Sequence, residues 1–181
     1  MKRKIIFLSA LIFFTSFAFS QAVEGGNKII NLNVGFVAQF NNGNIQIPPI
    51  SASFDYIVSQ AGPGYIGLGA LAGYATSKEE LRLYPGNYYT YNFILLAARG
   101  TYHWFPGQND KIDTYAGVTI GYNIVSHKYS GFANATDISQ KSAMLGGMFA
   151  GIRYFITPRL GINAEFSYGV SAVSIGGSFK F

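Results

Sequence analysis

The sequence predicts an all-β protein, an eight-stranded antiparallel transmembrane β-barrel with a polar, charge-paired interior. Three observations lead to this prediction. Segments of about ten residues that alternate apolar and polar side chains recur along the chain and end at turn-forming residues. The apolar face of these segments carries no charge, and the opposite face is rich in Gly, Ser and Asn. The first 20 residues have the pattern of a secretory leader.

Clusters of Gly, Pro, Asn and Asp mark the ends of the expected strands, because these residues favour turns. The clear breaks lie at 41–44, 61–64, 85–87, 106–110 and 157–159, and weaker ones fall within 126–140 and near Gly169. The expected strands are about 29–40, 50–58, 65–76, 88–105, 112–125, 141–156, 160–168 and 172–181. Residues 77–87 and 126–140 are then expected to be outer loops.

The two faces of each expected strand differ in charge. Successive side chains in a strand point to opposite faces, so Ile30, Leu32 and Val34 share one face, and Asn31 and Asn33 share the other. All charges within the strand cores lie on the Gly-, Ser- and Asn-rich face: Asp55, Arg99, Asp113, Arg153, Glu165 and Lys180. A soluble barrel, the alternative, would scatter charges over its outer face. An outward lipid face and a polar interior fit the pattern better, and strands in lipid must close into a barrel.

The three acids and three bases inside this barrel sum to zero charge. A charge in a narrow lumen is costly unless it is paired, and eight strands enclose a space that side chains can fill. We therefore predict a lumen closed by ion pairs, with Arg153 and Glu165 in reach of each other and His103 close to Asp113. The alternative is a gated solute path in which the ion pairs swing apart.

Aromatic side chains are expected at both ends of the lipid-facing surface, because amphipathic rings favour the membrane–water interface. Their abundance follows from β-propensity alone, but their grouping at two depths does not. With the N-terminus on the periplasmic side, the inner belt comprises Tyr56, Tyr102, Trp104, Tyr154, Phe179 and Phe181, and the outer belt Phe40, Tyr74, Tyr88, Tyr122 and Tyr168.

The N-terminus resembles a cleaved signal peptide in its order of segments. Residues 2–4 (KRK) form a basic region, 5–19 an apolar run, and 18–20 (AFS) a small-x-small cleavage site. We therefore divide the chain into a signal peptide at 1–20 and a barrel domain at 21–181. The apolar run of about 15 residues is short for a spanning helix of ~20. A retained N-terminal anchor is the alternative.

Charge and composition exclude several classes of protein. The net charge is +5, but removing the three basic residues of the leader from the 13 leaves 10 against 8 acids, or +2, so nucleic acid is not an expected partner. The absence of cysteine excludes disulfides and thiolate sites. With 12% charged and 17% aromatic residues, the chain is not disordered.

Candidate catalytic and metal-binding residues are few. The two histidines are His103, expected inward at the inner end, and His127, expected in an outer loop. His127 could form a triad with Ser126 or Ser130 and Asp137, but adjacent Ser and His are common in loops. Two histidines without suitably spaced acids give no metal signal. The sequence therefore predicts no enzyme, no metal and no cofactor.

Several segments resemble small outer-membrane β-barrel proteins of the OmpA/OmpX/OmpW-like superfamily, most closely its porin-like "outer membrane protein beta-barrel domain" group. They are 98–104, 113–117, 121–123 and 151–158, followed by Gly161 and Glu165. The resemblance implies a place in a bacterial outer membrane and contact with its lipid. Residues 177–181 resemble the terminal signal, here with Phe179 and Phe181, by which the insertion machinery recognises such barrels.

Two classes of function remain open from the sequence. The first is a structural or interaction role: envelope integrity, surface contact, or an accessory subunit of a larger envelope complex. The second is transport, as a narrow porin-like channel or a conduit for small or hydrophobic solutes. The motifs are moderately specific for the fold and weak for function, so neither a ligand nor a partner follows from them.

Overall fold

The computed structural model describes residues 22–36, 44–80, 86–104, 110–131, 142–169 and 171–181. The expected signal peptide, Phe40 and Asp137 lie outside these residues. The described chain contains eight strands: β1 (Lys28–Gly35), β2 (Asn44–Ala61), β3 (Gly64–Glu80), β4 (Tyr88–Trp104), β5 (Ile112–Ser130), β6 (Ala143–Phe155), β7 (Leu160–Ser167) and β8 (Val173–Lys180).

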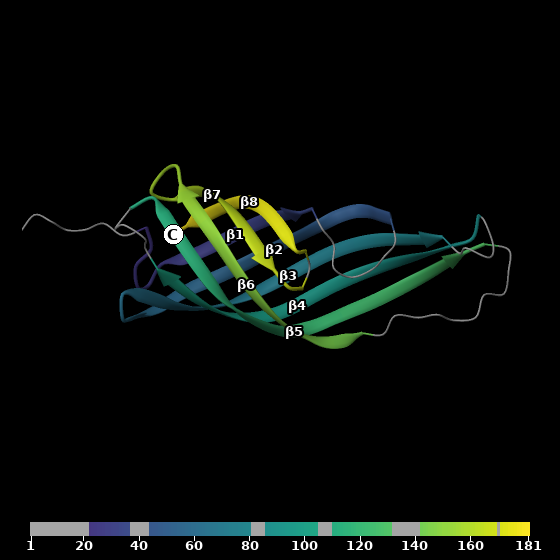
Figure 1. The fold of residues 1–181 in the computed structure, drawn as a ribbon, viewed down its shortest axis with the longest axis horizontal. Coiled ribbons are helices and arrows are strands. Elements are labelled where there is room, and N and C mark those ends of the chain that lie inside the picture. The colour runs from purple at the N-terminus through teal and green to yellow at the C-terminus, as the bar shows by residue number, and fades with distance from the viewer. Residues whose placement is uncertain (1–21, 37–43, 81–85, 105–109, 132–141, 170) are drawn as a thin grey trace, which may run out of the picture.

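The strands form one closed antiparallel barrel in sequence order, as the sequence predicts (Figure 1). Closure is made by β1, in which Ile30 lies opposite Phe54 of β2 and Phe179 of β8. Each strand therefore has a hydrogen-bonded neighbour on both sides, which is the condition for strands to lie in hydrocarbon. Among the described residues there is no helix long and apolar enough to span a membrane.

Burial in this barrel is the reverse of that in a soluble protein. Large apolar side chains are the exposed ones, with exposed fractions of 63% for Leu32, 59% for Val118 and 74% for Met148. Charged side chains are the buried ones, and Asp55 and Arg153 are 0% exposed. An apolar exterior and a polar interior are typical of a transmembrane barrel. The predicted division of the two faces is therefore confirmed.

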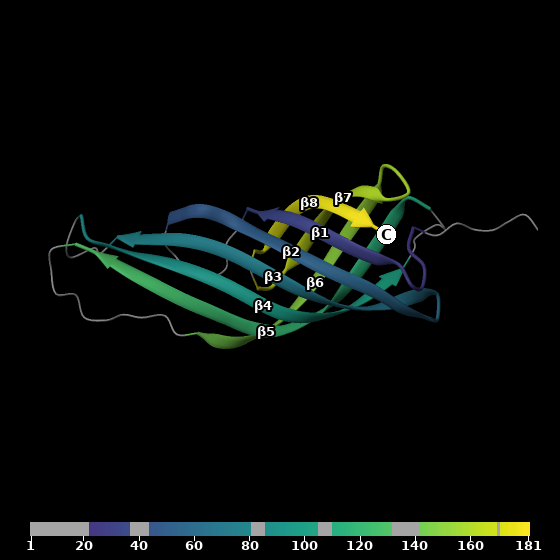
Figure 2. The same ribbon diagram turned by 180° about the vertical axis from the view of Figure 1, so that it is seen from behind.

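The two ends of the barrel differ in shape. One end, which we call the short-turn end, holds the start of β1 and the end of β8, and a two-residue turn joins β2 to β3. In that turn Gly62 adopts a φ of 60°, in the left-handed region that glycine favours. At the other end, the long-strand end, β3, β4 and β5 project furthest, as the two opposite views show (Figures 1 and 2).

Strand length explains this asymmetry. The strands β2 to β5 contain 17 to 19 residues each, whereas β1, β7 and β8 contain 8 each. We call β2 to β5 the tall wall. The prediction of loops at 77–87 and 126–140 is wrong for residues 77–80 and 126–130, which continue β3 and β5. Beyond the membrane an outward side chain need not be apolar, so the polar residues there end the apolar pattern without ending the strand.

Candidate functional site

Six buried ionisable side chains meet in the lumen toward the short-turn end. We call this group the charge layer: Asp55, Arg99, His103, Asp113, Arg153 and Glu165. All six are predicted site residues, and each is 5% exposed or less. They come from β2, β4, β5, β6 and β7, so the layer connects opposite sides of the barrel.

Arg99 bridges two carboxylates on different strands. Its Nε lies 3.3 Å from Oδ1 of Asp55, and its Nη2 donates a hydrogen bond of 3.0 Å to Oε2 of Glu165. Gly69 lies between Arg99 and Asp55 in the strand register. A side chain at Gly69 would clash with the backbone of Phe54 and crowd Asp55, so glycine there lets the ion pair form across β3.

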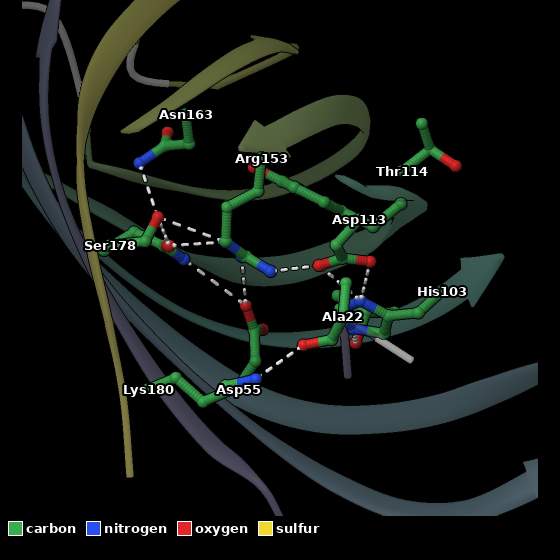
Figure 3. Close-up of polar contacts among 12 residues, drawn as sticks. Ala22, Asp55, His103, Asp113, Thr114, Arg153, Asn163, Ser178 and Lys180 are labelled. Atoms are coloured by element: carbon green, nitrogen blue, oxygen red, sulfur yellow. Dashed lines mark hydrogen bonds and ion pairs between the residues drawn. The ribbon is translucent and has the colours of Figure 1, made fainter. Parts of the chain in front are cut away.

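Arg153 makes the second set of contacts (Figure 3). It lies opposite Asp113 in the β5–β6 register and donates from Nη1 to Oδ2 of that residue. Its Nη2 is 3.8 Å from Oδ2 of Asp55, so Asp55 joins the two arginines into one network. Its Nε donates to Oγ of Ser178 and Oδ1 of Asn31, at 3.1 and 3.2 Å. Hydrogen bonds to neutral groups thus satisfy Nε of the buried guanidinium, while Nη2 has only the longer ion-pair contact with Asp55.

His103 and the neighbouring Tyr115 make the remaining contacts to the carboxylates of the charge layer. Nδ1 of His103 lies 3.0 Å from Oδ1 of Asp113, and its Nε2 lies 3.1 Å from Oγ1 of Thr101. The hydroxyl of Tyr115 donates to Oε2 of Glu165 at 3.2 Å. The layer therefore brings together three carboxylates, two guanidinium groups and one imidazole.

The predicted pairing of Arg153 with Glu165 is replaced by others, whereas His103 lies close to Asp113 as expected. Arg153 lies opposite Asn163, and Glu165 lies opposite Gly151, so Arg153 pairs with Asp113 and Asp55 while Glu165 reaches Arg99. The lumen is narrow enough for side chains on non-adjacent strands to meet, which hairpin geometry alone does not reveal.

Lys180 does not join the charge layer, although the sequence predicts it as one of the three bases that balance the three acids of the lumen. Its Nζ donates a hydrogen bond of 2.7 Å to the carbonyl oxygen of Ala22 (Figure 3). The same Nζ lies 4.6 Å from the centre of the Phe155 ring. As the last residue of β8, Lys180 lies at the barrel mouth, beyond the paired carboxylates.

Residues 22–27 form what we call the N-terminal cap at this mouth. Ala22 and Val23 are fully buried against Ile29, Ile57 and Phe155. The cap is attached to β2 by two backbone hydrogen bonds, from Gly26 N–H to Ile57 O and from Ile57 N–H to Asn27 O. The sequence reasoning missed this cap, because two apolar residues before a Gly-Gly-Asn turn form no strand pattern.

Comparison with known proteins identifies the fold. No protein-family model and no curated protein matches the sequence. The solved structure of OprG from Pseudomonas aeruginosa, an outer-membrane protein, is similar with a TM-score of 0.54 at 12% identity, over 90% of this chain and 98% of that one. The chain has the fold of the small outer-membrane β-barrels.

Two further structures of this fold are similar over most of their length. The N-terminal β-barrel domain of Pseudomonas aeruginosa OprF gives a TM-score of 0.51 at 13% identity, over 87% of this chain and 98% of that one. Ail, the attachment invasion locus protein of Yersinia pestis, solved with the heparin analogue sucrose octasulfate, gives 0.51 at 14%, over 87% and 100%. At these identities the likeness establishes the fold alone.

The aromatic residues of the expected belts that the structure describes lie on the outward face of this outer-membrane-type barrel. At the short-turn end, Tyr56, Trp104 and Tyr154 are exposed, and Phe179 stacks on Phe181. Tyr102 is half-buried, and its hydroxyl donates to the carbonyl oxygen of Ala61. Toward the long-strand end, Tyr122 and Tyr168 are exposed, while Tyr74 and Tyr88 are half-buried.

A second inward-facing group lies on the tall wall near the long-strand end. We call it the upper aromatic cluster: Ala75, Tyr89, Tyr91, Phe93, Val125 and Tyr129. The His127 ring centre lies 6.3 Å from that of Tyr89 and 6.2 Å from that of Tyr91. His127 lies in β5 and not in a loop as predicted. Because successive side chains of a strand point to opposite faces, Ser126 points away from His127. Among the described residues no group of His, Cys, Asp or Glu could hold a metal ion.

Proposed function

We propose that the chain is an integral protein of a bacterial outer membrane with a closed lumen and a structural or interaction role. That role is envelope integrity, surface contact, or service as an accessory subunit of a larger envelope complex. The observation that carries this proposal is the charge layer, whose buried ion pairs link five strands across the lumen. The N-terminal cap adds an apolar closure at the adjacent mouth.

Electrostatics explains why the charge layer would resist passage. Breaking a buried pair by removing one partner leaves an uncompensated charge and costs about 3–5 kcal/mol. A solute that separates Arg99 from Asp55 and Glu165 would have to replace two contacts at once. A closed lumen leaves the outer surfaces of the barrel as the regions that act on other molecules.

The proposed orientation follows from the lengths of the connections. Barrels of this kind have short turns on the periplasmic side and longer loops outside. The short-turn end is then periplasmic, and the tall wall projects from the outer surface, where it is available for surface contact. We propose that a signal peptide at 1–20 directs export, and that Phe179 and Phe181 serve recognition by the insertion machinery. We propose no enzymatic role, because Ser126 and Ser130 lie on the face of β5 opposite to His127.

Conductance across a planar lipid bilayer tests the closed lumen. The full chain should give no steady channel current, whereas Arg99→Gln and Arg153→Gln variants should conduct, because each leaves one carboxylate, Glu165 or Asp113, without its guanidinium partner. Arg159→Gln, at an exposed position in the β6–β7 turn, is the matched control and should stay silent. Steady current through the unmodified barrel would overturn the proposal.

A gated conduit for small or hydrophobic solutes is the second candidate function. The observation that favours it is a set of buried side-chain oxygens, Oδ1 of Asn33, Asn123 and Asn163, that have no hydrogen-bond partner among the described residues. Buried polar atoms of this kind are commonly satisfied by water, so part of the lumen would be hydrated. Current that appears and disappears in the unmodified protein would support this function over a closed barrel.

Crosslinking in native membranes, followed by purification of the chain, tests the interaction role. A stable protein partner captured by the unmodified chain and lost when exposed residues of the tall wall are changed would support surface contact or subunit assembly. Lys128→Glu on β5 and Arg159→Glu at the opposite end form a matched pair of variants, since both positions are exposed. Equal capture by both variants would argue against a role for the tall wall.

A further inference from the structure

The outward face of the tall wall changes from apolar to polar at the same level on three strands. The last apolar row is Tyr74, Ile94 and Ile124, which are cross-strand neighbours in the β3–β4 and β4–β5 registers. Two residues further along each strand, the next row is Thr76, Asn92 and Ser126. Because three neighbouring strands change together, this level marks the upper edge of the hydrocarbon along β3, β4 and β5, whereas on β2 the exposed Ile45 and Ile47 continue beyond it.

Two lysines occupy the following row on the same face. Lys78 of β3 and Lys128 of β5 lie on either side of Thr90 of β4. Adjacent strands are about 4.8 Å apart, so the two lysine backbones are separated by about 10 Å. Long ammonium-bearing side chains at that spacing can both reach one anionic group above Thr90, whose hydroxyl is a further donor.

This row lies just above the lipid headgroups, within reach of a lysine side chain. Four residues beyond the last apolar row, at about 3.3 Å per residue, correspond to about 13 Å along the strand. A strand tilt of about 40° reduces this to about 10 Å along the membrane normal. The headgroup region is about 5–8 Å thick on each side, and a lysine side chain can extend down into it.

The surrounding contacts organise the row for an anion. Nζ of Lys78 lies 3.4 Å from the centre of the Tyr88 ring, which holds the ammonium group on one side and leaves its donors directed away from the ring. In the row below, Oδ1 of Asn92 accepts hydrogen bonds from the hydroxyls of Tyr74 and Thr76, so its amide N–H donors remain for another acceptor.

Competing carboxylates are already engaged or point elsewhere. Glu80 is on the same face one row further out, where its Oε1 accepts the Gly86 N–H at 3.0 Å. Glu79 lies on the opposite face of β3 by strand alternation. Among the described residues neither Lys78 nor Lys128 forms a salt bridge. The row therefore carries two cations that lack an internal counter-charge within the described part of the chain.

We propose that Lys78, Thr90 and Lys128 bind the phosphate group of an anionic lipid headgroup, on the tall-wall side of the barrel only. The strands opposite are too short to carry an equivalent row, since β7 and β8 have 8 residues each. The inference rests on the membrane placement of the barrel but not on a closed lumen. The lipid-binding test can therefore fail while the conductance test succeeds, and the reverse.

The test measures lipid retained by the full-length folded chain in nanodiscs that contain phosphatidylcholine with a minority of phosphatidic acid. Each lysine of the row is expected to contribute roughly fivefold in affinity for the anionic headgroup that it contacts, so Lys78→Gln/Lys128→Gln should retain phosphatidic acid about 25-fold less tightly. Lys28→Gln is the matched control, because Lys28 is exposed at the other end and also lies over an aromatic ring, that of Phe181.

Three outcomes decide the proposal. Loss of retention in the double variant with normal retention in Lys28→Gln supports it, and the single variant Lys128→Gln, which keeps the Lys78–Tyr88 contact, should show about a fivefold loss on its own. Equal retention by all variants overturns it. If millimolar inorganic phosphate displaces the lipid from the unmodified chain, the site takes soluble phosphate, and the assignment to a membrane lipid is wrong.

Discussion

The two ends of the lumen are filled by opposite chemistry. Toward the short-turn end, the charge layer consists of ion pairs and hydrogen bonds, with Arg153 contacting Asp113, Asp55 and Ser178. Toward the long-strand end, the upper aromatic cluster consists of packed rings, with Tyr91 and Phe93 at 6.3 Å between ring centres. The first group lies on strands surrounded by lipid, and the second lies on the part of the tall wall that rises above it.

This difference predicts that a single substitution destabilises the barrel by different amounts in the two groups. An ion-pair network has a large penalty for any single deletion, because the partner left behind stays buried and charged. A cluster of rings loses only the contacts of the ring removed, and its neighbours can relax into the space. We therefore expect the charge layer to control both stability and permeability, and the upper aromatic cluster to control stability of the tall wall alone.

The largest effect is expected for Arg153→Ala. This change leaves the buried Asp113 without a guanidinium partner and leaves Asp55 with Arg99 alone, so it should lower the free energy of unfolding by about 3–5 kcal/mol. Urea unfolding in lipid vesicles measures this quantity. Arg159→Ala, an arginine removed from an exposed turn, should change it by less than about 0.5 kcal/mol. Similar losses for both variants would contradict the assignment of the charge layer.

A smaller effect is expected for Phe93→Ala in the upper aromatic cluster. Phe93 is 2% exposed, and truncating a buried phenylalanine should cost about 3 kcal/mol, at the lower end of the usual range because one side of the cluster can collapse. Hydrogen exchange should speed up in β4 and β5 near Phe93 and Val125, which are cross-strand neighbours. The Ser126→Ala variant, at an exposed position on the other face, is the control.

The conductance of the same Phe93→Ala variant tests whether the two ends of the lumen have separate roles. If the two ends have separate roles, this variant should remain as silent in planar bilayers as the unmodified barrel, although it is destabilised. Channel current in Phe93→Ala would place part of the closure in the upper aromatic cluster. The distinction between the two ends would then be lost.

The sequence predicts which face of a strand each side chain occupies better than it predicts which side chains pair across the lumen. Alternation with a period of two is a local property, so the inward position of Asp55 and the outward position of Leu32 can be read directly from the chain. The contact between Arg99 and Glu165 joins residues 66 positions apart on strands that are not neighbours. It depends on the width of the closed lumen, which no local pattern encodes.

The length of the tall wall escapes prediction for a different reason. Lys78 and Lys128 interrupt the apolar repeat and therefore resemble loop residues, yet backbone pairing continues through Lys78↔Thr90 and Thr90↔Lys128. The apolar pattern reports the thickness of the membrane, not the length of the strand. The N-terminal cap is equally hidden, because it is held by a lysine 158 positions away in the sequence.

The smallest effect is expected for Lys180→Met, which tests whether the cap depends on that lysine. Methionine keeps an apolar side chain over Phe155 but cannot donate to the carbonyl oxygen of Ala22, so the loss should be about 1 kcal/mol. Because the cap also packs Val23 against Ile57, opening should stay local. Amide exchange should rise at Gly26, whose N–H donates to Ile57 O, and stay unchanged at Asn31 in β1. Uniform acceleration throughout β1 would show instead that the cap unfolds together with the barrel.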